Sequence, residues 1–197
     1  MIRRLSPLSG AVLLLLAACG RSGPPPRMYV LGNPQRVVTA STSQSRLPVI
    51  EVARVRVPGY LDTTDIITRS GSQVIPSDTG HWAERLSAGV ARALAADLTT
   101  QLPAMHVTTA QPASSPARQV LVDVETLEAR PDHQVVMVAN WSITDGRAER
   151  TLLAKHSTFA IPVQGAGDAG VVAAMTRAVS ELADQVANGI RRAPPRH

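Results

Sequence analysis

Three side chains that could carry acid–base chemistry lie close together in the sequence: Asp62, Asp65 and His81. Two carboxylates in one site can act as an acid and a base, and with a histidine they would suit a hydrolase. The competing interpretation is structural, because Thr63 and Thr64 separate the aspartates and Asp is favoured in turns. The sequence contains no GxSxG or SxxK nucleophile motif. We therefore predict that the chain is not an enzyme and has no catalytic residues.

Metal and phosphate chemistry find little support in the sequence. The 5 histidines form no HxxH, HxxxH or HExxH pair, which are the local patterns of a metal site. The segment GAGDAG at 165–170 is glycine-rich and precedes an expected helix, so it could surround an anion. It lacks the Lys and the Ser or Thr of a phosphate loop. We interpret it as a flexible lead into the helix, and we predict no metal and no cofactor.

The chain has a single cysteine, Cys19, which rules out an internal disulfide and a metal site built from several cysteines. It follows Arg3, Arg4 and the apolar run AVLLLLAA. A basic start, a short apolar run and small residues, in this order, are typical of a secretory signal peptide. The run is too short to span a bilayer. We predict that residues 1–18 are a signal peptide rather than a buried helix.

The four residues Leu16-Ala17-Ala18-Cys19 resemble the bacterial lipobox, in which a Leu and two small residues precede the cysteine. The resemblance implies cleavage before Cys19 and lipidation of its sulfur, whereas the alternative is an ordinary free thiol. Two or three acyl chains, such as palmitate, anchor a protein durably. By the same resemblance, Gly20 favours the outer membrane, with the protein on its periplasmic face. Residues 19–27 would then be a lipidated tether, extended by three prolines.

Alternating apolar residues and turn signals predict the elements of the mature chain. Period-two patterns indicate strands, and apolar residues four positions apart indicate helices. Strands are expected at 28–32, 47–61, 118–130, 134–146 and 150–163, with a hairpin at 65–77 that turns at Ser70-Gly71. Helices are expected at 82–102, which Pro103 ends, and at 168–192, with Asp168 as the N-cap.

These elements predict an α/β fold. We expect a two-layer sandwich with a mixed, mainly antiparallel sheet of about six strands and two main helices on one face. The elements form a single α/β periplasmic domain over 28–192, with a polar loop at 33–46 and a tail at 193–197.

Charge and aromatic content argue against nucleic acid as a partner. Lys and Arg total 20 against 15 Asp and Glu, and the excess is spread along the chain. Nucleic-acid binders concentrate positive charge and often stack bases on aromatic side chains. This chain has only 2 Trp, 2 Tyr and 1 Phe. We predict that it binds no nucleic acid and meets the membrane through its lipid anchor.

The order of motifs from 52 to 103 resembles the ABC-type transport auxiliary lipoproteins, the PqiC-like family. That family has a strand, then Pro-x-Tyr-Leu-Asp, then a strand with Ile and Arg, then Trp-Ala-Glu, and Gln-Leu-Pro after a helix. The matching residues are Pro58, Tyr60, Leu61, Asp62, Ile67, Arg69, Trp82, Ala83, Glu84, Leu102 and Pro103. Arg85 departs from the pattern, because many relatives carry Pro there. The resemblance implies a periplasmic auxiliary subunit that accompanies MCE-domain proteins and their membrane components in moving lipid between membranes.

A partner surface is expected on the sheet face that the helices leave uncovered. Val136 and Val138 give that face a partly apolar, uncharged character, which suits protein contact. Tyr60 and Leu61 follow the end of a strand, where binding residues often lie, although both could instead cap the core. We expect these four residues to contact an MCE-domain partner or a second copy of the chain. A self-contained lipid-binding module, with a cavity between sheet and helices, is the remaining alternative.

Overall fold

The structure is a computed structural model that describes residues 25–32, 47–148 and 150–193. Within these ranges it contains two helices, α1 (Leu86–Gln101) and α2 (Gly167–Arg192). Its eight strands are β1 (Arg27–Tyr29), β2 (Val49–Arg56), β3 (Asp65–Ser70), β4 (Gln73–Trp82), β5 (His106–Thr108), β6 (Arg118–Ala129), β7 (Gln134–Asp145) and β8 (Thr151–Pro162). The predicted signal peptide, Cys19, Gly20 and the predicted loop at 33–46 lie outside the described residues.

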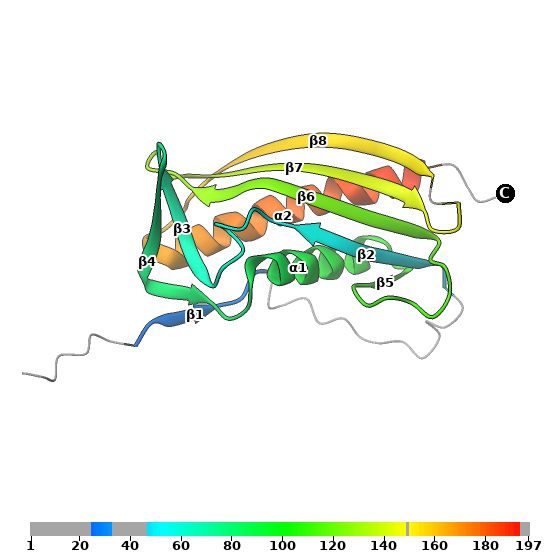
Figure 1. The fold of residues 1–197 in the computed structure, drawn as a ribbon, viewed down its shortest axis with the longest axis horizontal. Helices are drawn as coiled ribbons and strands as arrows, with labels where there is room; N and C mark the ends of the chain where they lie inside the picture. The colour runs from blue at the N-terminus through cyan, green and yellow to red at the C-terminus, as the bar shows by residue number, and fades with distance from the viewer. Residues whose placement is uncertain (1–24, 33–46, 149, 194–197) are drawn as a thin grey trace, which may run out of the picture.

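The strands form one mixed sheet around β6 (Figure 1). On one side, β6 pairs antiparallel with β7 along its length, and β7 pairs antiparallel with β8. On the other side, the first half of β6 pairs parallel with β2, while its last residue pairs with β3. The strand β5 extends the β2 branch, and β4 and β1 extend the β3 branch.

The predicted α/β class, the mixed sheet and the two helices are confirmed, with eight strands in place of about six. The sequence pattern did not predict β5, the short strand at the end of the β2 branch. The strand β5 has only 3 residues, too few for a period-two pattern to mark it. It forms because it lies beside β2, where Val49 pairs with His106.

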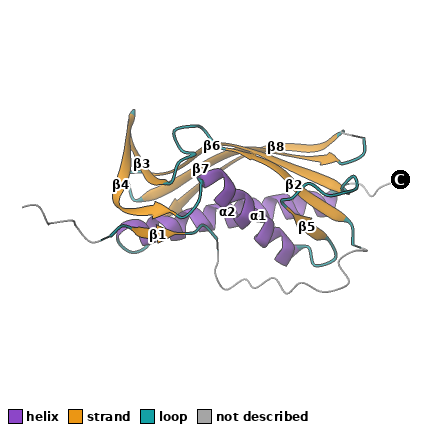
Figure 2. Ribbon diagram, turned by 60° about the horizontal axis from the view of Figure 1, so that its bottom comes forward, coloured by secondary structure: helices purple, strands orange, loops and turns teal. Residues whose placement is uncertain are grey.

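Both helices lie under one face of the sheet, which we call the inner face (Figure 2). Inner-face residues of β6 and β7, such as Val122 and Met137, are 0% exposed. On α2 the apolar stripe packs into the same core through Val179, Leu182 and Val186, each also 0% exposed. One continuous apolar cluster therefore joins the sheet to both helices. Among the described residues, neither helix combines the length and the apolar character needed to cross a membrane.

The first helix starts later than its apolar spacing predicts. Trp82 was expected to begin the helix, but it ends β4, and α1 begins at Leu86. The Trp82 amide donates to the carbonyl of Thr64 at 2.7 Å, so backbone pairing holds this residue in the sheet. Its side chain is 2% exposed and still packs in the core. The apolar spacing of the predicted helix therefore includes Trp82, although the backbone of Trp82 is extended.

The second helix also starts differently from the prediction. Its N-cap is Ala166, and Asp168 lies in the first turn rather than at the cap. Gly165 and Gly167 have φ angles of 86° and 65°, a region that favours glycine. Residues 165–170 were expected to lead into the helix, but residues 167–170 already belong to α2, so only Gly165 and Ala166 precede it. The predicted end of this helix at Arg192 is confirmed.

Candidate partner-binding site on the outer face

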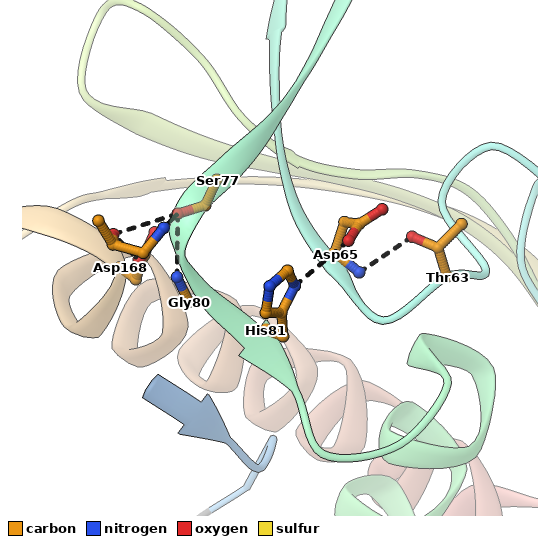
Figure 3. A network of polar contacts seen from close by, with 7 residues as sticks. Thr63, Asp65, Ser77, Gly80, His81 and Asp168 are labelled. Atoms are coloured by element: carbon orange, nitrogen blue, oxygen red, sulfur yellow. Dashed lines mark hydrogen bonds and ion pairs between the residues drawn. The ribbon is translucent and has the colours of Figure 1, made fainter. Parts of the chain in front are cut away.

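Of the three residues that could have formed an acid–base site, only Asp65 and His81 are brought together. His81 Nδ1 lies 3.3 Å from Asp65 Oδ1, across the β3–β4 ladder. The Asp65 amide donates to Thr63 Oγ1 at 3.1 Å, which is the turn interaction that the sequence offered as the alternative (Figure 3). Asp62 turns instead toward the start of α1. Asp65 and His81 therefore form a pair that does not include Asp62.

Asp62 acts as a cap for α1 from outside the helix. Its Oδ1 accepts a hydrogen bond from the Ser87 amide at 2.9 Å, and its Oδ2 lies 3.6 Å from the Arg85 guanidinium. Burial raises the pKa of Asp62, but the hydrogen bonds of Ser87 and the charge of Arg85 outweigh it, so the pKa lies below its ordinary value. Since Arg85 at the N-cap makes no side-chain cap bond, Asp62 supplies the missing acceptor.

A second polar network ties the start of α2 to β4. Asp168 Oδ2 accepts hydrogen bonds from Ser77 Oγ at 2.9 Å and from Thr79 Oγ1 at 2.6 Å. The Gly80 amide donates to Ser77 Oγ at 3.3 Å (Figure 3). A Cβ at Gly80 would come within 2.6 Å of Asp168 Oδ2, so glycine is needed for this approach. The Asp168 carboxylate occupies the positive end of the helix, where an anion would otherwise bind.

On the outer face of the sheet, away from the helices, Tyr60, Arg69 and Glu128 form a compact group that we call the outer cluster. The Tyr60 hydroxyl donates to Glu128 Oε2 at 3.0 Å and accepts from Arg69 at 3.3 Å. Arg69 Nε lies 3.9 Å from Glu128 Oε1. The guanidinium also lies 5.7 Å from the centre of the Tyr60 ring, within the range of a cation–π contact.

The outer cluster holds a carboxylate that is almost completely removed from solvent. The Glu128 side chain is 4% exposed, whereas that of Arg69 is 37% exposed. Burial, followed by the hydrogen bond and the negative charge of Glu128, raises the pKa of Tyr60 above its ordinary value, against the opposing effect of Arg69. The tyrosine therefore stays a neutral donor at physiological pH. A buried charge of this kind depends on its partners for compensation.

A cavity of about 590 Å³ opens beside the outer cluster, between the β3–β4 hairpin and the β6–β7 turn. Its walls include Arg69, Glu128 and Arg130. In the β6–β7 ladder, Glu128 pairs with Val136 and Thr126 pairs with Val138. The two valines therefore lie on the strand next to the cavity, and the sheet register brings them close to the outer cluster.

Three of the four predicted contact residues thus lie in one region of the outer face. Tyr60 is 37% exposed, Val136 is 9% exposed and Val138 is half-buried. Leu61 is different, because it is 0% exposed and belongs to the core cluster. The prediction that Leu61 contacts a partner is therefore wrong. The turn that starts at Pro58, whose carbonyl accepts from the Leu61 amide at 2.9 Å, directs this side chain inward.

Sequence reasoning missed Arg69 and Glu128 as members of the site. Arg69 was visible only as a motif residue, and Glu128 lies at the end of a strand that alternates apolar and polar residues. The pairing of Thr68 with Ala129 joins the two strands at this point. Because that contact spans distant parts of the chain, no local pattern could reveal it.

The outer cluster is a group of mutually paired side chains. Its polar groups are satisfied by one another, and Thr144 Oγ1 is the one buried side-chain polar atom without a partner among the described residues. In the same residues, no group of three His, Cys, Asp or Glu side chains could hold a metal ion. The core cluster lies between the sheet and the two helices.

The sequence matches the family described as ABC-type transport auxiliary lipoprotein component over residues 29–187. The chain belongs to this family. It is a family of transport auxiliary lipoproteins and not of enzymes, and its members are lipoproteins of the PqiC-like kind. Among curated protein sequences, none matches the chain significantly.

Two solved structures have a similar fold. One is an uncharacterized protein with 20% identity and a TM-score of 0.70, covering 84% of this chain and 98% of its own. The other is protein XCC0632 from Xanthomonas campestris, with 14% identity and a TM-score of 0.59, covering 85% of this chain and 95% of its own. At these identities the likeness concerns the fold alone.

Proposed function

We propose that the chain is an auxiliary subunit of an MCE/ABC-type intermembrane lipid transport system, anchored in the outer membrane on its periplasmic face. The observation that carries this proposal is the family match over residues 29–187 in a chain whose only cysteine follows a signal-like segment. Residues 1–18 would be removed, Cys19 would carry the lipid, and Gly20 would direct the protein to the outer membrane.

The anchor would hold the folded domain close to the membrane. From Cys19 to Arg27, where β1 begins, the chain spans nine residues, which extend to at most roughly 3.6 Å each. Three prolines in this stretch favour an extended form. A tether of this length confines the domain to a layer beside the membrane and raises its effective concentration for a partner in the periplasm.

The partner would bind at the outer cluster and the neighbouring valines. Tyr and Arg are enriched among residues that contribute most to protein interfaces, and here Tyr60 and Arg69 are held in place by Glu128. Val138, which is half-buried, supplies uncharged surface next to them, whereas Val136 is 9% exposed and contributes little. Because the group is preorganised, little side-chain entropy would be lost on binding. An MCE-domain protein is the partner that the family resemblance implies.

Mass spectrometry of the mature N-terminus, combined with separation of the two membranes, tests the anchor. We expect a chain that begins at Cys19, carries acyl groups and fractionates with the outer membrane. The Cys19→Ser variant should lose both the acyl groups and the membrane association, while its circular dichroism spectrum remains that of a folded domain. A mature chain that begins at Met1, or one with an unmodified Cys19, would contradict the proposal.

A further inference from the structure

The strands at the edges of the sheet differ greatly in length. The strands β1 and β5, which end the two branches, have 3 residues each. The strand β8 has 12 residues and pairs only with β7 among the described strands. Figure 1 shows it along the upper edge of the sheet. Short edge strands are a usual protection against unwanted pairing, so β8 is the edge that offers backbone groups to another strand.

A groove runs between this edge and the last turns of α2. It has a volume of about 330 Å³, and Leu152 and Leu153 from β8 form part of its wall. A Cβ at Gly189 would come within 2.8 Å of Leu153 Cδ2. The missing side chain therefore lets the helix approach β8 and form the other wall.

The charges beside this groove are all positive. Lys155 and Arg192 line it, both are exposed, and neither forms an ion pair within the described part of the chain. Among the described residues, no Asp or Glu lines the groove. Lys155 pairs with Trp141, an inner-face residue, so its side chain lies on the helix side of the edge. Two cations beside a groove that is lined partly by Leu152 and Leu153 are complementary to a carboxylate.

A second copy of the chain does not fit this edge well. The strand β8 contains Lys155 and His156 but no acidic residue, so pairing of two β8 strands would bring like charges together without compensation. A register shift between Ile143 and Thr144 also disturbs the start of the strand. Inward-pointing lysines and bulges are devices that discourage indiscriminate pairing. These features disfavour pairing with β8 of a second copy, but they still allow pairing with a strand of opposite charge.

We propose that β8 accepts an extended segment of another protein as an added strand, with a carboxylate directed at Lys155 and Arg192 and an apolar side chain in the groove. Main-chain hydrogen bonds to the free edge would hold the segment, and the alternating side chains would select it. This site is separate from the outer cluster, so the proposal does not depend on the partner inferred above.

Site-specific photo-crosslinking in cells that produce the full-length protein tests this proposal. A photoreactive residue would replace Ala154 or Thr158, which are exposed positions of β8, and Thr100, an exposed position of α1, serves as the control. We expect the β8 positions to crosslink to a segment of another protein in which acidic and apolar residues alternate, as identified by mass spectrometry. The control position should not capture that segment.

Charge reversal then distinguishes the proposed recognition from nonspecific binding. The double variant Lys155→Glu, Arg192→Glu should lower the crosslink yield about tenfold, with an unchanged thermal unfolding midpoint. If this variant does not fold, Lys155→Gln with Arg192→Gln decides the question by the same readout. Crosslinks to a second copy, to a segment without acidic residues, or to nothing would overturn the proposal, as would a yield that charge reversal leaves unchanged.

Discussion

The two faces of the central strands have different roles, although residues that are adjacent in the same strand supply both faces. On the inner face, Val122 and Met137 are fully buried against the helices. On the outer face, the neighbouring positions Asp123 and Val138 are partly exposed, and the outer cluster adds a buried carboxylate. Alternation along β6 and β7 therefore separates residues that stabilise the fold from residues available to a partner.

The largest expected effect compares Met137 with Val138, which are adjacent in β7 and point to opposite faces. Met137 is 0% exposed, so Met137→Ala should lower the free energy of unfolding by about 2–5 kcal/mol. Val138→Ala removes a half-buried side chain and should cost less than about 1.5 kcal/mol. Urea unfolding of both variants measures the difference. Equal losses would show that the two faces do not differ in their contribution to stability.

The next effect concerns the buried carboxylate of the outer cluster. Arg69→Leu leaves Glu128 with only the Tyr60 hydroxyl and should lower the free energy of unfolding by about 1–2 kcal/mol. Arg56→Leu is the matched control, because the Arg56–Asp123 pair has the same 3.9 Å separation with side chains 65% and 48% exposed.

The control should change stability by less than about 1 kcal/mol, since exposed ion pairs contribute little. Adding Glu128→Gln to Arg69→Leu should restore part of the loss, because it removes the uncompensated charge. Chemical unfolding at neutral pH measures all three variants. If Arg69→Leu is no more destabilising than Arg56→Leu, the outer cluster is an ordinary surface group.

The smallest effect concerns Asp62, which caps α1. Asp62→Ala should lower the free energy of unfolding by about 1 kcal/mol, whereas Asp62→Asn keeps an acceptor for the Ser87 amide and should cost only a few tenths. Because the pKa of Asp62 is lowered in the folded state, its stabilisation is present above the ordinary carboxyl pKa of about 4 and is lost as the pH falls through the lowered value.

Thermal unfolding of wild type and Asp62→Asn across the acid range checks this pH dependence. The difference in stability between the two proteins should shrink as the pH falls. A difference that is constant with pH would mean that the charge of Asp62 does not contribute.

Much of the fold could be predicted from the sequence because it depends on local periodicity. The meander of β6, β7 and β8 follows from alternating apolar residues and from turns near Pro131 and Gly146. The start of α1 could not be predicted, because the side chain of Trp82 fits a helical stripe while its backbone pairs with Thr64. That pairing is a tertiary interaction, and no local pattern reports it.

The site was only partly predictable for the same reason. Tyr60, Val136 and Val138 were identified from their position at a strand end or on a sheet face, and the register places them near one another. Leu61 was misplaced because the direction of a side chain in a turn depends on the turn's own hydrogen bonds. Glu128 was missed because its partners, Tyr60 and Arg69, come from distant parts of the chain.

Co-purification of an MCE-domain protein with the full-length chain tests the central claim most directly. The pull-down would use detergent extracts of cells that produce wild type, Tyr60→Ala or Val138→Glu, with Arg56→Leu as a control away from the outer cluster. Circular dichroism would verify folding. We predict that wild type and the control recover the MCE-domain protein, and that both outer-face variants recover at least about fivefold less while remaining folded. Equal recovery by all four proteins, or no MCE-domain protein with wild type, would contradict the account.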